Sequence, residues 1–288
     1  MRRLALLVVL ISVVTAAHGQ FDIPPAIWTQ PVEPFHIAGN LYYVGSADLT
    51  SYLFVTPKGN ILLDVGVPEN VSMVEANIRK LGFHMKDVKI LLNSHAHFDH
   101  AGGLQAVKKI TGARVVASVG DAPELASGGR DDFAFGNRYP YPPVKADRII
   151  QDGGRVELGG TVLTAHLTPG HTRGCTTWTT EIADGGKTYH AVFVCSVSFP
   201  GFKLVHNPKN PHLAADYQHS FQVLRSLPCD IFLASHGSFF DLPRKIAELK
   251  QSPSHNPFVD PAGYRRFLDH SQAAFEAELK TQMQGSRH

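Results

Sequence analysis

The sequence predicts an α/β fold, and three observations carry that prediction. Short apolar runs of strand length alternate with segments whose apolar residues recur at helical spacing. Three of the apolar runs end in turns that carry histidines, and side chains gather in this way at the strand ends of an open sheet packed with helices. Of the 288 residues, 43% are hydrophobic and 18% are charged, which is ordinary for a globular protein that buries a full-sized core.

The N-terminal residues have the pattern of a signal peptide. Two arginines precede a largely apolar run over 4–17, and small residues follow at the two positions that a signal peptidase reads. We therefore predict a signal peptide over 1–19 and a single domain over 20–288. An uncleaved membrane anchor is the alternative, but the run is short for a span of about 20 residues. No later stretch is apolar and long enough to cross a bilayer, so we expect an exported protein, periplasmic or secreted, without stable membrane insertion after cleavage.

The first part of the mature chain reads as an arm followed by strands and helices. Residues 20–34 are Pro-rich and irregular, with Phe21, Ile27 and Trp28 as expected anchors, and an arm of this kind often covers a site. A turn signal at Pro57-Lys58-Gly59 separates two of the first three strands, which we interpret as an antiparallel meander. The expected strands span 35–44, 52–56, 60–64, 87–92 and 113–118, and the expected helices span 71–81, 104–111 and 122–125.

A long loop separates these elements from the rest. Residues 128–143 are rich in glycine, proline and aromatics, namely Phe133, Phe135, Tyr139 and Tyr141. Because long irregular segments in a compact domain are usually functional, we expect this loop to rim a cleft; the alternative for any single aromatic is packing onto the body. The later strands are expected over 148–158, 161–167, 175–181, 188–194 and 230–234, and the later helices over 214–227, 243–249 and 262–283.

The stretch after the strand at 87–92 is rich in side chains that bind divalent cations: His95, His97, Asp99 and His100. In an extended or turning backbone the first three point broadly to one side and His100 points elsewhere, so the cluster offers ligands to two neighbouring sites. Imidazole with carboxylate favours zinc or iron over magnesium or calcium. The alternative is a chance cluster among the 16 histidines in a solvated loop, which gives no reason for such costly groups after a buried strand.

Two later strands also end in a histidine. The strand at 161–167 leads to His171, and the strand at 230–234 leads to His236. With the first cluster they make six ligands, which suits two four- or five-coordinate metal ions that share a water-derived oxygen. His166, inside its strand, is interpreted as structural.

Three residues near the first cluster have a structural interpretation. Asp64 ends a buried strand, and it either fixes the neighbouring loop or caps a turn; the sequence leaves both open. Gly102 and Gly103 are expected to let the backbone turn tightly into the following helix.

Charge and cysteine content narrow the function further. The net charge is +2 and there is no long basic run, so nucleic acid is not an expected partner.

Three cysteines in an exported protein leave at least one free or paired between chains. Counting outward from Gly185 in a predicted hairpin turn, Cys175 and Cys195 are each ten residues away, so they form a disulfide or pack as small buried hydrophobes. Cys229 is expected in the core.

The histidine segments resemble those of the metallo-β-lactamase superfamily. Its metal-binding signature is matched by His95-Ala96-His97-Phe98-Asp99-His100, and its later histidine segments are similar to those at His171 and His236. The resemblance covers essentially all of the mature chain and implies an αβ/βα four-layer sandwich, with two mixed sheets flanked by helices and the metals at one edge. The motif is poorly specific for substrate, because thioesterases, lactonases and nucleases share it.

Within the superfamily, the chain is most similar to the third subclass of class B β-lactamases. Other hydrolases of the fold carry a bridging aspartate where this chain has Val194-Cys195-Ser196, without an acid. The resemblance implies that Cys195 faces away from the metals, and that a disulfide to Cys229 is absent because Tyr264 occupies the partner's position. It implies a first zinc bound by His95, His97 and His171, and a second zinc bound by Asp99, His100 and His236.

The resemblance implies zinc-dependent hydrolysis of the β-lactam ring of penicillins, cephalosporins and carbapenems by a metal-bound hydroxide, conferring antibiotic resistance. Asp99 would orient the nucleophile. Ser196 and Ser198 would hold the carboxylate of the small-molecule substrate, with ordinary turn serines as the alternative. Two Zn²⁺ ions and a monomer are expected. The alternative functions are a lactonase or thioesterase on the same fold, or a metal-binding protein without turnover.

Overall fold

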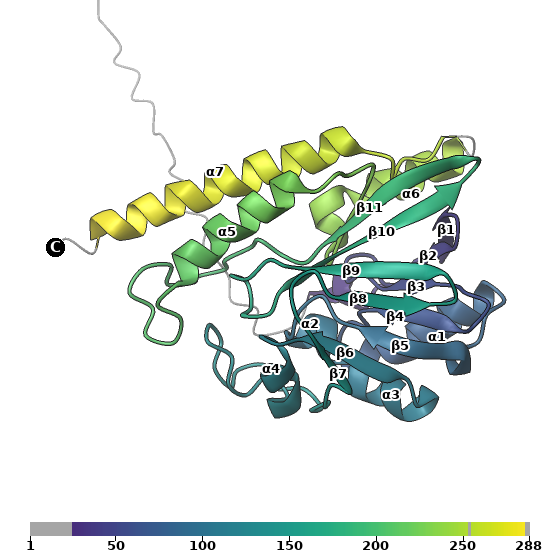
Figure 1. Cartoon of the computed structure of the whole chain (residues 1–288), viewed down its shortest axis with the longest axis horizontal. Helices are drawn as coiled ribbons and strands as arrows, with labels where there is room; N and C mark the ends of the chain where they lie inside the picture. The colour runs from purple at the N-terminus through teal and green to yellow at the C-terminus, as the bar shows by residue number, and fades with distance from the viewer. Residues whose placement is uncertain (1–24, 253–254, 286–288) are drawn as a thin grey trace, which may run out of the picture.

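Two β-sheets packed face to face form the centre of the structure, with helices on both outer faces (Figure 1). This computed structural model describes residues 25–252 and 255–285. The predicted signal peptide and Phe21 lie outside the described residues. The two mixed sheets flanked by helices confirm the fold that the sequence predicts.

The first sheet is formed by the first half of the described chain. Its strands are β1 (Phe35–Ala38), β2 (Leu41–Tyr43), β3 (Tyr52–Phe54), β4 (Asn60–Leu63), β5 (Val88–Leu92), β6 (Arg114–Ser118) and β7 (Arg148–Ile150), in that order in space. The first four pair antiparallel, which confirms the predicted meander, and β4 to β7 pair parallel. Parallel pairing brings the carboxyl ends of β4, β5 and β6 to one edge of the sheet.

Helices α1 (Val71–Lys80) and α3 (Leu104–Thr111) bury one apolar side against this sheet, and α4 (Ala122–Ser127) follows β6. The short helix α2 (Phe98–Ala101), inside the histidine cluster, was not predicted. Gly102 and Gly103 have ordinary helical φ values of −57° and −86°, so a special turn is not the reason for glycine here. The reason is space, because a Cβ on Gly103 would lie 2.5 Å from the side chain of Val65.

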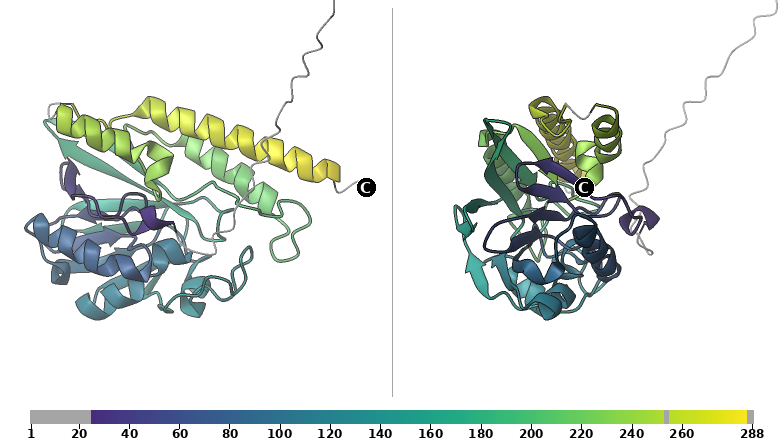
Figure 2. Two further views of the ribbon diagram at one scale, coloured as in Figure 1. Left: turned by 180° about the vertical axis from the view of Figure 1, so that it is seen from behind. Right: turned by 90° about the vertical axis from the view of Figure 1, so that its right-hand side faces the viewer.

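The second sheet is formed by the second half. Its strands are β8 (Arg155–Leu158), β9 (Thr161–Leu167), β10 (Thr176–Asp184), β11 (Lys187–Val194) and β12 (Ile231–Ala234). Strands β8 to β11 pair antiparallel, and β12 pairs parallel with β11. Its helices are α5 (Leu213–Ser226), α6 (Leu242–Gln251) and α7 (Pro261–Gly285), and Figure 2 shows α5 and α7 side by side. The described residues also form four short 3₁₀ helices: η1 (Ala26–Trp28), η2 (Pro68–Asn70), η3 (Met85–Asp87) and η4 (Gly237–Phe240).

Two predicted strands are each split in two. The run at 35–44 forms β1 and β2, because the chain reverses at Gly39, whose φ is +51°. The run at 148–158 forms β7 and β8, with a turn at Gly153, whose φ is +69°. This second break is where the chain leaves the first sheet and enters the other.

The main core lies between the two sheets. Tyr52 of β3 and Phe193 of β11 meet there edge to face, with ring centroids 5.0 Å apart. Trp178 of β10 is fully buried, and its indole N–H donates to the Asn93 carbonyl at 3.1 Å. Asn93 begins the histidine-rich loop, which follows β5 of the first sheet. A core residue of the second sheet therefore holds a loop of the first sheet.

The expected anchors of the N-terminal arm are only partly correct. Trp28 is buried, but Ile27 is 41% exposed, so the prediction that Ile27 anchors the arm is wrong. Successive residues of η1 point to different sides, and Trp28 is the one that faces the body. In the part of the chain that the structure describes, no helix is long and apolar enough to span a membrane.

The cysteines follow one of the two predicted arrangements. Cys175 and Cys195 form a disulfide with Cα atoms 5.8 Å apart. The hairpin register pairs Asp184 with Lys187, so the cysteines are not directly opposite each other; both lie just beyond the strand ends, where the backbone allows the offset. Cys229 is free and partly buried, and it packs against the main core. Tyr264 is buried.

Candidate metal centre

Six side chains from three strand ends meet at one edge of the sandwich. The loop after β5 carries His95, His97, Asp99 and His100, while His171 follows β9 and His236 follows β12. His236 and His100 are 136 residues apart in sequence, yet their Nε2 atoms lie 3.1 Å apart. The structure therefore brings together all six predicted ligands, in two groups of three.

The first group consists of His95, His97 and His171. Their ligand atoms all lie within 4.8 Å of one another. The Nδ1 atom of His97 lies 3.0 Å from Nε2 of His171, and Nε2 of His95 is buried without a hydrogen-bond partner. Burial and then the neighbouring imidazoles lower the pKa of His95 well below its usual value, which favours the neutral ring that binds metals.

The second group consists of Asp99, His100 and His236. Oδ2 of Asp99 lies 3.3 Å from Nε2 of His100 and 3.5 Å from Nε2 of His236. Burial alone would raise the pKa of Asp99, but the two histidines outweigh it and hold that pKa well below its usual value. Asp99 is therefore an ionised carboxylate, the form that binds metal.

Each histidine of the two groups has an oxygen atom of the protein behind it; four of the five are within hydrogen-bond distance, whereas Asp64 approaches Nδ1 of His100 without a hydrogen bond. The contacts are Ser94 Oγ to His95 Nδ1 (3.0 Å), Asp132 Oδ2 to His97 Nε2 (3.2 Å), Asp64 Oδ2 to His100 Nδ1 (3.5 Å), the Ser198 carbonyl to His171 Nδ1 (2.8 Å) and Asp48 Oδ2 to His236 Nδ1 (2.9 Å). Asp48 shows how such a contact changes a pKa. Burial would raise the pKa of Asp48, but its hydrogen bond to His236 and the charge of that ring lower it to about 2.

This geometry fits metal ions. Ligands at 2.0–2.1 Å from a tetrahedral ion lie about 3.3 Å apart, close to the spacing within the second group. Oxygen atoms behind metal-binding histidines orient the rings and fix which nitrogen carries the proton. The unpartnered Nε2 of His95 is a buried polar atom that a metal ion in the first group would satisfy.

Two further aspartates hold the ligand-bearing loops. Asp64 accepts from the Ser94 backbone N–H at 2.7 Å, which confirms the loop-fixing alternative. Asp121, after β6, accepts from Ala96 N at 2.9 Å and from Thr172 Oγ1 at 2.9 Å, and so joins the loops of the two sheets. Burial raises the pKa of Asp121 to about 6.

A cleft of about 440 Å³ opens onto both groups. Its wall is largely aromatic, with Trp28 from the arm, Phe98 from α2 and Phe239 from η4. Phe135 and Tyr139 also line it, which confirms that the 128–143 loop rims a cleft. By contrast, Phe133 and Tyr141 are buried, which agrees with the alternative that a single aromatic side chain of this loop packs onto the body of the protein.

The two predicted substrate-binding serines have different positions. Ser198 lines the cleft, whereas Ser196 is 2% exposed and lies behind it, with the two hydroxyl oxygens 3.1 Å apart. Cys195 is bonded to Cys175 and is not available as a ligand. His166 bonds Thr179 Oγ1 on β10 at 2.8 Å, in keeping with a structural role.

Sequence reasoning missed three carboxylates of the site: Asp48, Asp121 and Asp132. Asp121 lies just after a buried strand, the signal that identified the histidines, and could have been found from it. Asp48 and Asp132 lie in irregular segments, and Asp48 is 188 residues from its partner His236, so no local pattern marks them.

Comparison with known proteins identifies relatives over most of the chain. The family model described as the metallo-beta-lactamase superfamily matches residues 48–236. The FEZ-1 metallo-β-lactamase from Legionella gormanii is 51% identical, with a TM-score of 0.87 over 88% of this chain and 98% of that one. The subclass B3 enzyme BJP-1 from Bradyrhizobium japonicum is 36% identical, with a TM-score of 0.84 over 90% and 98% of the two chains.

Curated sequence relatives have other activities and match less of the chain. A hydroxyacylglutathione hydrolase from Hyphomonas neptunium is 28% identical over 44% of this chain, and an atrochrysone carboxyl ACP thioesterase from Aspergillus fumigatus is 22% identical over 68% of it. The chain spans 41% and 39% of the lengths of these two proteins.

Proposed function

Since the chain belongs to the metallo-β-lactamase superfamily, we propose that this hydrolase opens the β-lactam ring of penicillins, cephalosporins and carbapenems and thereby confers antibiotic resistance. The observation that carries the proposal is similarity over nearly the whole length of solved β-lactamases, at 51% identity for one of them. By contrast, this chain matches only 41%, 26% and 25% of the lengths of three curated relatives that have another activity.

Two zinc ions are the proposed cofactors, one in each group. When bound, they would supply Lewis acidity and lower the pKa of a water molecule. A solved relative from a soil metagenome, 36% identical, is described as a class B3 di-zinc enzyme. In this chain the five oxygen contacts behind the histidines keep the ring nitrogens directed inward, so that the ligand set is preorganised.

Asp99 and Ser198 are the proposed reaction residues beyond the histidines. The Asp99 carboxylate is ionised and would orient the attacking water as well as bind the second zinc. Ser198 would donate its hydroxyl to the substrate carboxylate, because it lines the cleft. Ser196 would act on the substrate through Ser198, since its hydroxyl lies 3.1 Å from that of Ser198.

The same proposal includes the cellular context. The proposed enzyme meets antibiotics outside the cytoplasm. Consistent with this, we propose a signal peptide over 1–19, a catalytic domain over 20–288, a periplasmic or secreted location and a monomeric state. The Zn²⁺ ions and a small-molecule lactam are its proposed partners.

The first prediction concerns activity and metal removal. The purified protein is expected to hydrolyse a chromogenic cephalosporin, to lose that activity after dialysis against a chelator, and to regain it with Zn²⁺. Asp99→Ala is expected to bind one equivalent less zinc and to lose about 100-fold or more in kcat. Asp269→Ala, which removes a 68%-exposed carboxylate on α7, is the control and should retain both.

The alternatives give different results in the same assay series. Hydrolysis of an acyl lactone or a glutathione thioester without lactam hydrolysis would replace the proposed substrate with that of the sequence relatives. Zinc binding without turnover of any of the three substrates would leave a metal-binding protein. Full activity of Asp99→Ala would contradict the two-metal mechanism.

A further inference from the structure

Asp132 uses its two carboxylate oxygens for different purposes. Oδ1 accepts from the backbone N–H groups of Ala134 at 2.7 Å and Phe135 at 2.5 Å, which folds the start of the loop's aromatic segment. Oδ2 lies 3.2 Å from Nε2 of His97 in the first group. Asp132 is 4% exposed, so both contacts lie away from solvent. One carboxylate therefore joins a loop at the cleft to a metal ligand.

The contact with His97 determines which ring nitrogen faces the metal site. A carboxylate is an acceptor only, so Nε2 of His97 must carry the hydrogen that it donates to Asp132. Nδ1 then has a free lone pair, and it is the atom that lies 3.0 Å from Nε2 of His171. Asp132 thus selects the tautomer of His97 in which Nδ1 is ready to bind.

The same loop also makes two aromatic contacts with the ligand-bearing segment. The ring of Phe135 packs against that of His97 at a tilt of 58°, with centroids 5.1 Å apart, and Tyr139 stacks on Phe98 at 4.8 Å with an interplanar angle of 19°. Both aromatic residues also line the cleft. A movement of this loop would therefore change the cleft wall and the surroundings of His97 together.

We propose that Asp132 is a positioning residue that couples the conformation of the 128–143 loop to metal binding by the first group. The inference rests on the proposed metal binding and not on the identity of the substrate. Coupling between two sites is reciprocal. Metal in the first group stabilises the loop in its folded position, and the folded loop raises the affinity of the first group for metal.

Asp132→Asn separates the two purposes of the carboxylate. The amide oxygen of asparagine still accepts from the two backbone N–H groups, and its NH₂ group then faces Nε2 of His97. Because two donors cannot pair, His97 is driven to the tautomer with its hydrogen on Nδ1, the atom that must bind the metal. The side chain keeps its size, so the loop and the fold are conserved. The matched control is Asp131→Asn, which makes the same change at the exposed neighbouring position.

The test measures Zn²⁺ affinity of the metal-free full-length protein by competition with a chromophoric chelator, and hydrogen exchange of the 128–143 backbone with and without Zn²⁺. In Asp132→Asn, the affinity for one of the two zinc equivalents is expected to fall by about 10- to 100-fold. Zinc should slow exchange in the loop of the parent protein and of Asp131→Asn, and should do so much less in Asp132→Asn.

Different outcomes overturn different statements. Parent-like zinc affinity and parent-like loop protection in Asp132→Asn would show that the contact with His97 has no positioning effect, even if KM changed. An equal loss in Asp131→Asn would assign the effect to general loop charge and also contradict the inference. A parent protein that binds no zinc would contradict the proposed function itself.

Discussion

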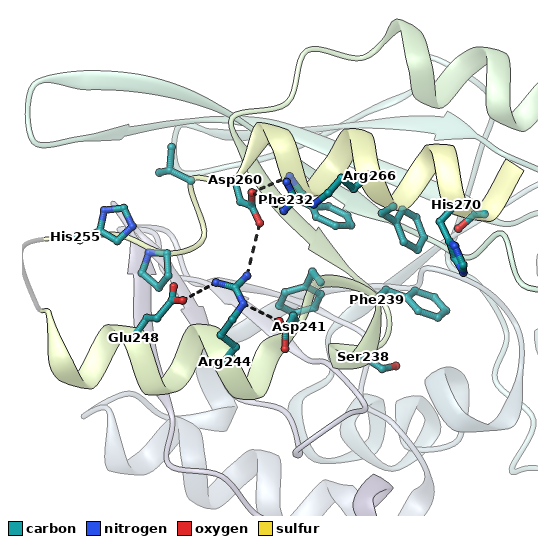
Figure 3. Close-up of a pocket in the computed structure, with 16 residues that line it drawn as sticks. Phe232, Ser238, Phe239, Asp241, Arg244, Glu248, His255, Asp260, Arg266 and His270 are labelled. Atoms are coloured by element: carbon teal, nitrogen blue, oxygen red, sulfur yellow. Dashed lines mark hydrogen bonds and ion pairs between the residues drawn. The ribbon is translucent and has the colours of Figure 1, made fainter. Parts of the chain in front are cut away.

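Lys245 is the residue whose burial has the clearest energetic consequence. Its side chain is fully buried, with Nζ 3.1 Å from Oδ2 of Asp260 and 5.7 Å from the ring centroid of Phe232. Burial lowers the pKa of Lys245, and Asp260 opposes that change. Asp260 itself is 19% exposed and borders a pocket where Arg244 also approaches it (Figure 3). Water and arginine can therefore solvate the aspartate, whereas in the described residues the lysine ammonium faces three phenylalanine rings at 5.7–5.8 Å.

This asymmetry predicts unequal effects for the two halves of the pair. Asp260→Asn keeps the hydrogen-bonding shape but leaves a buried ammonium without its counter-ion, and should cost about 3 kcal/mol in the free energy of unfolding. Lys245→Met fills the same space without charge and should cost less than about 1 kcal/mol. Urea denaturation of the metal-free variants measures both values. Equal losses would mean that the charge of Lys245 is solvated by another route.

At the scale of elements, Asp121 connects the two halves of the sandwich. It follows β6 of the first sheet, and besides its bonds to Ala96 and Thr172 it accepts from Gly174 N at 2.7 Å, just before β10. Its carboxylate is 2% exposed. A single buried side chain thus receives three donors from the two ligand-bearing loops.

Asp121→Ala is expected to destabilise the protein by about 3 kcal/mol or more, because three buried donors lose their acceptor. The matched control is Asp147→Ala, which removes an aspartate that accepts from the Val115 N–H but is 37% exposed. That loss should be about 1 kcal/mol, since water replaces the carboxylate. Chemical denaturation without metal measures both, and a loss for Asp121→Ala no greater than the control's would contradict the connecting role.

The same scale shows what the sequence could predict. Strands that end in histidines predict the ligand set, because the periodicity of apolar residues and the change from apolar to polar residues are both local signals in the sequence. The splits at Gly39 and Gly153 were missed because Gly39-Asn40 and Asp152-Gly153 were not interpreted as turns inside the predicted strands. Asp48 and Asp132 could not be predicted, since their contacts depend on how irregular segments fold over a finished sheet edge.

At the scale of the whole molecule, each metal group draws ligands from both sheets. His95 and His97 come from the first sheet and His171 from the second; likewise His100 and His236 are on different sheets. A metal ion in either group therefore links the two halves of the sandwich. Binding that occurs only in the folded state adds its free energy to stability.

Metal removal is accordingly expected to lower the midpoint of thermal unfolding. Zinc at about 1,000 times its Kd adds about 4 kcal/mol, which corresponds to a shift of roughly 10 °C for a domain of this size. Thermal scans with a chelator and with graded Zn²⁺ measure the shift, and Asp99→Ala should show a smaller one. A midpoint independent of zinc would mean that the ions do not bridge the halves.

The late position of β12 has a consequence for how the site is completed. Five of the six donors precede His236, which is 136 residues from His100 in the sequence and reaches it from the end of β12, the strand that pairs with β11. A chain that emerges from the N-terminus onward, or that is cut before β12, has the histidine-rich loop but cannot close the second group. Full metal loading is therefore a late assembly step, and it distinguishes finished molecules from truncated or partly folded ones.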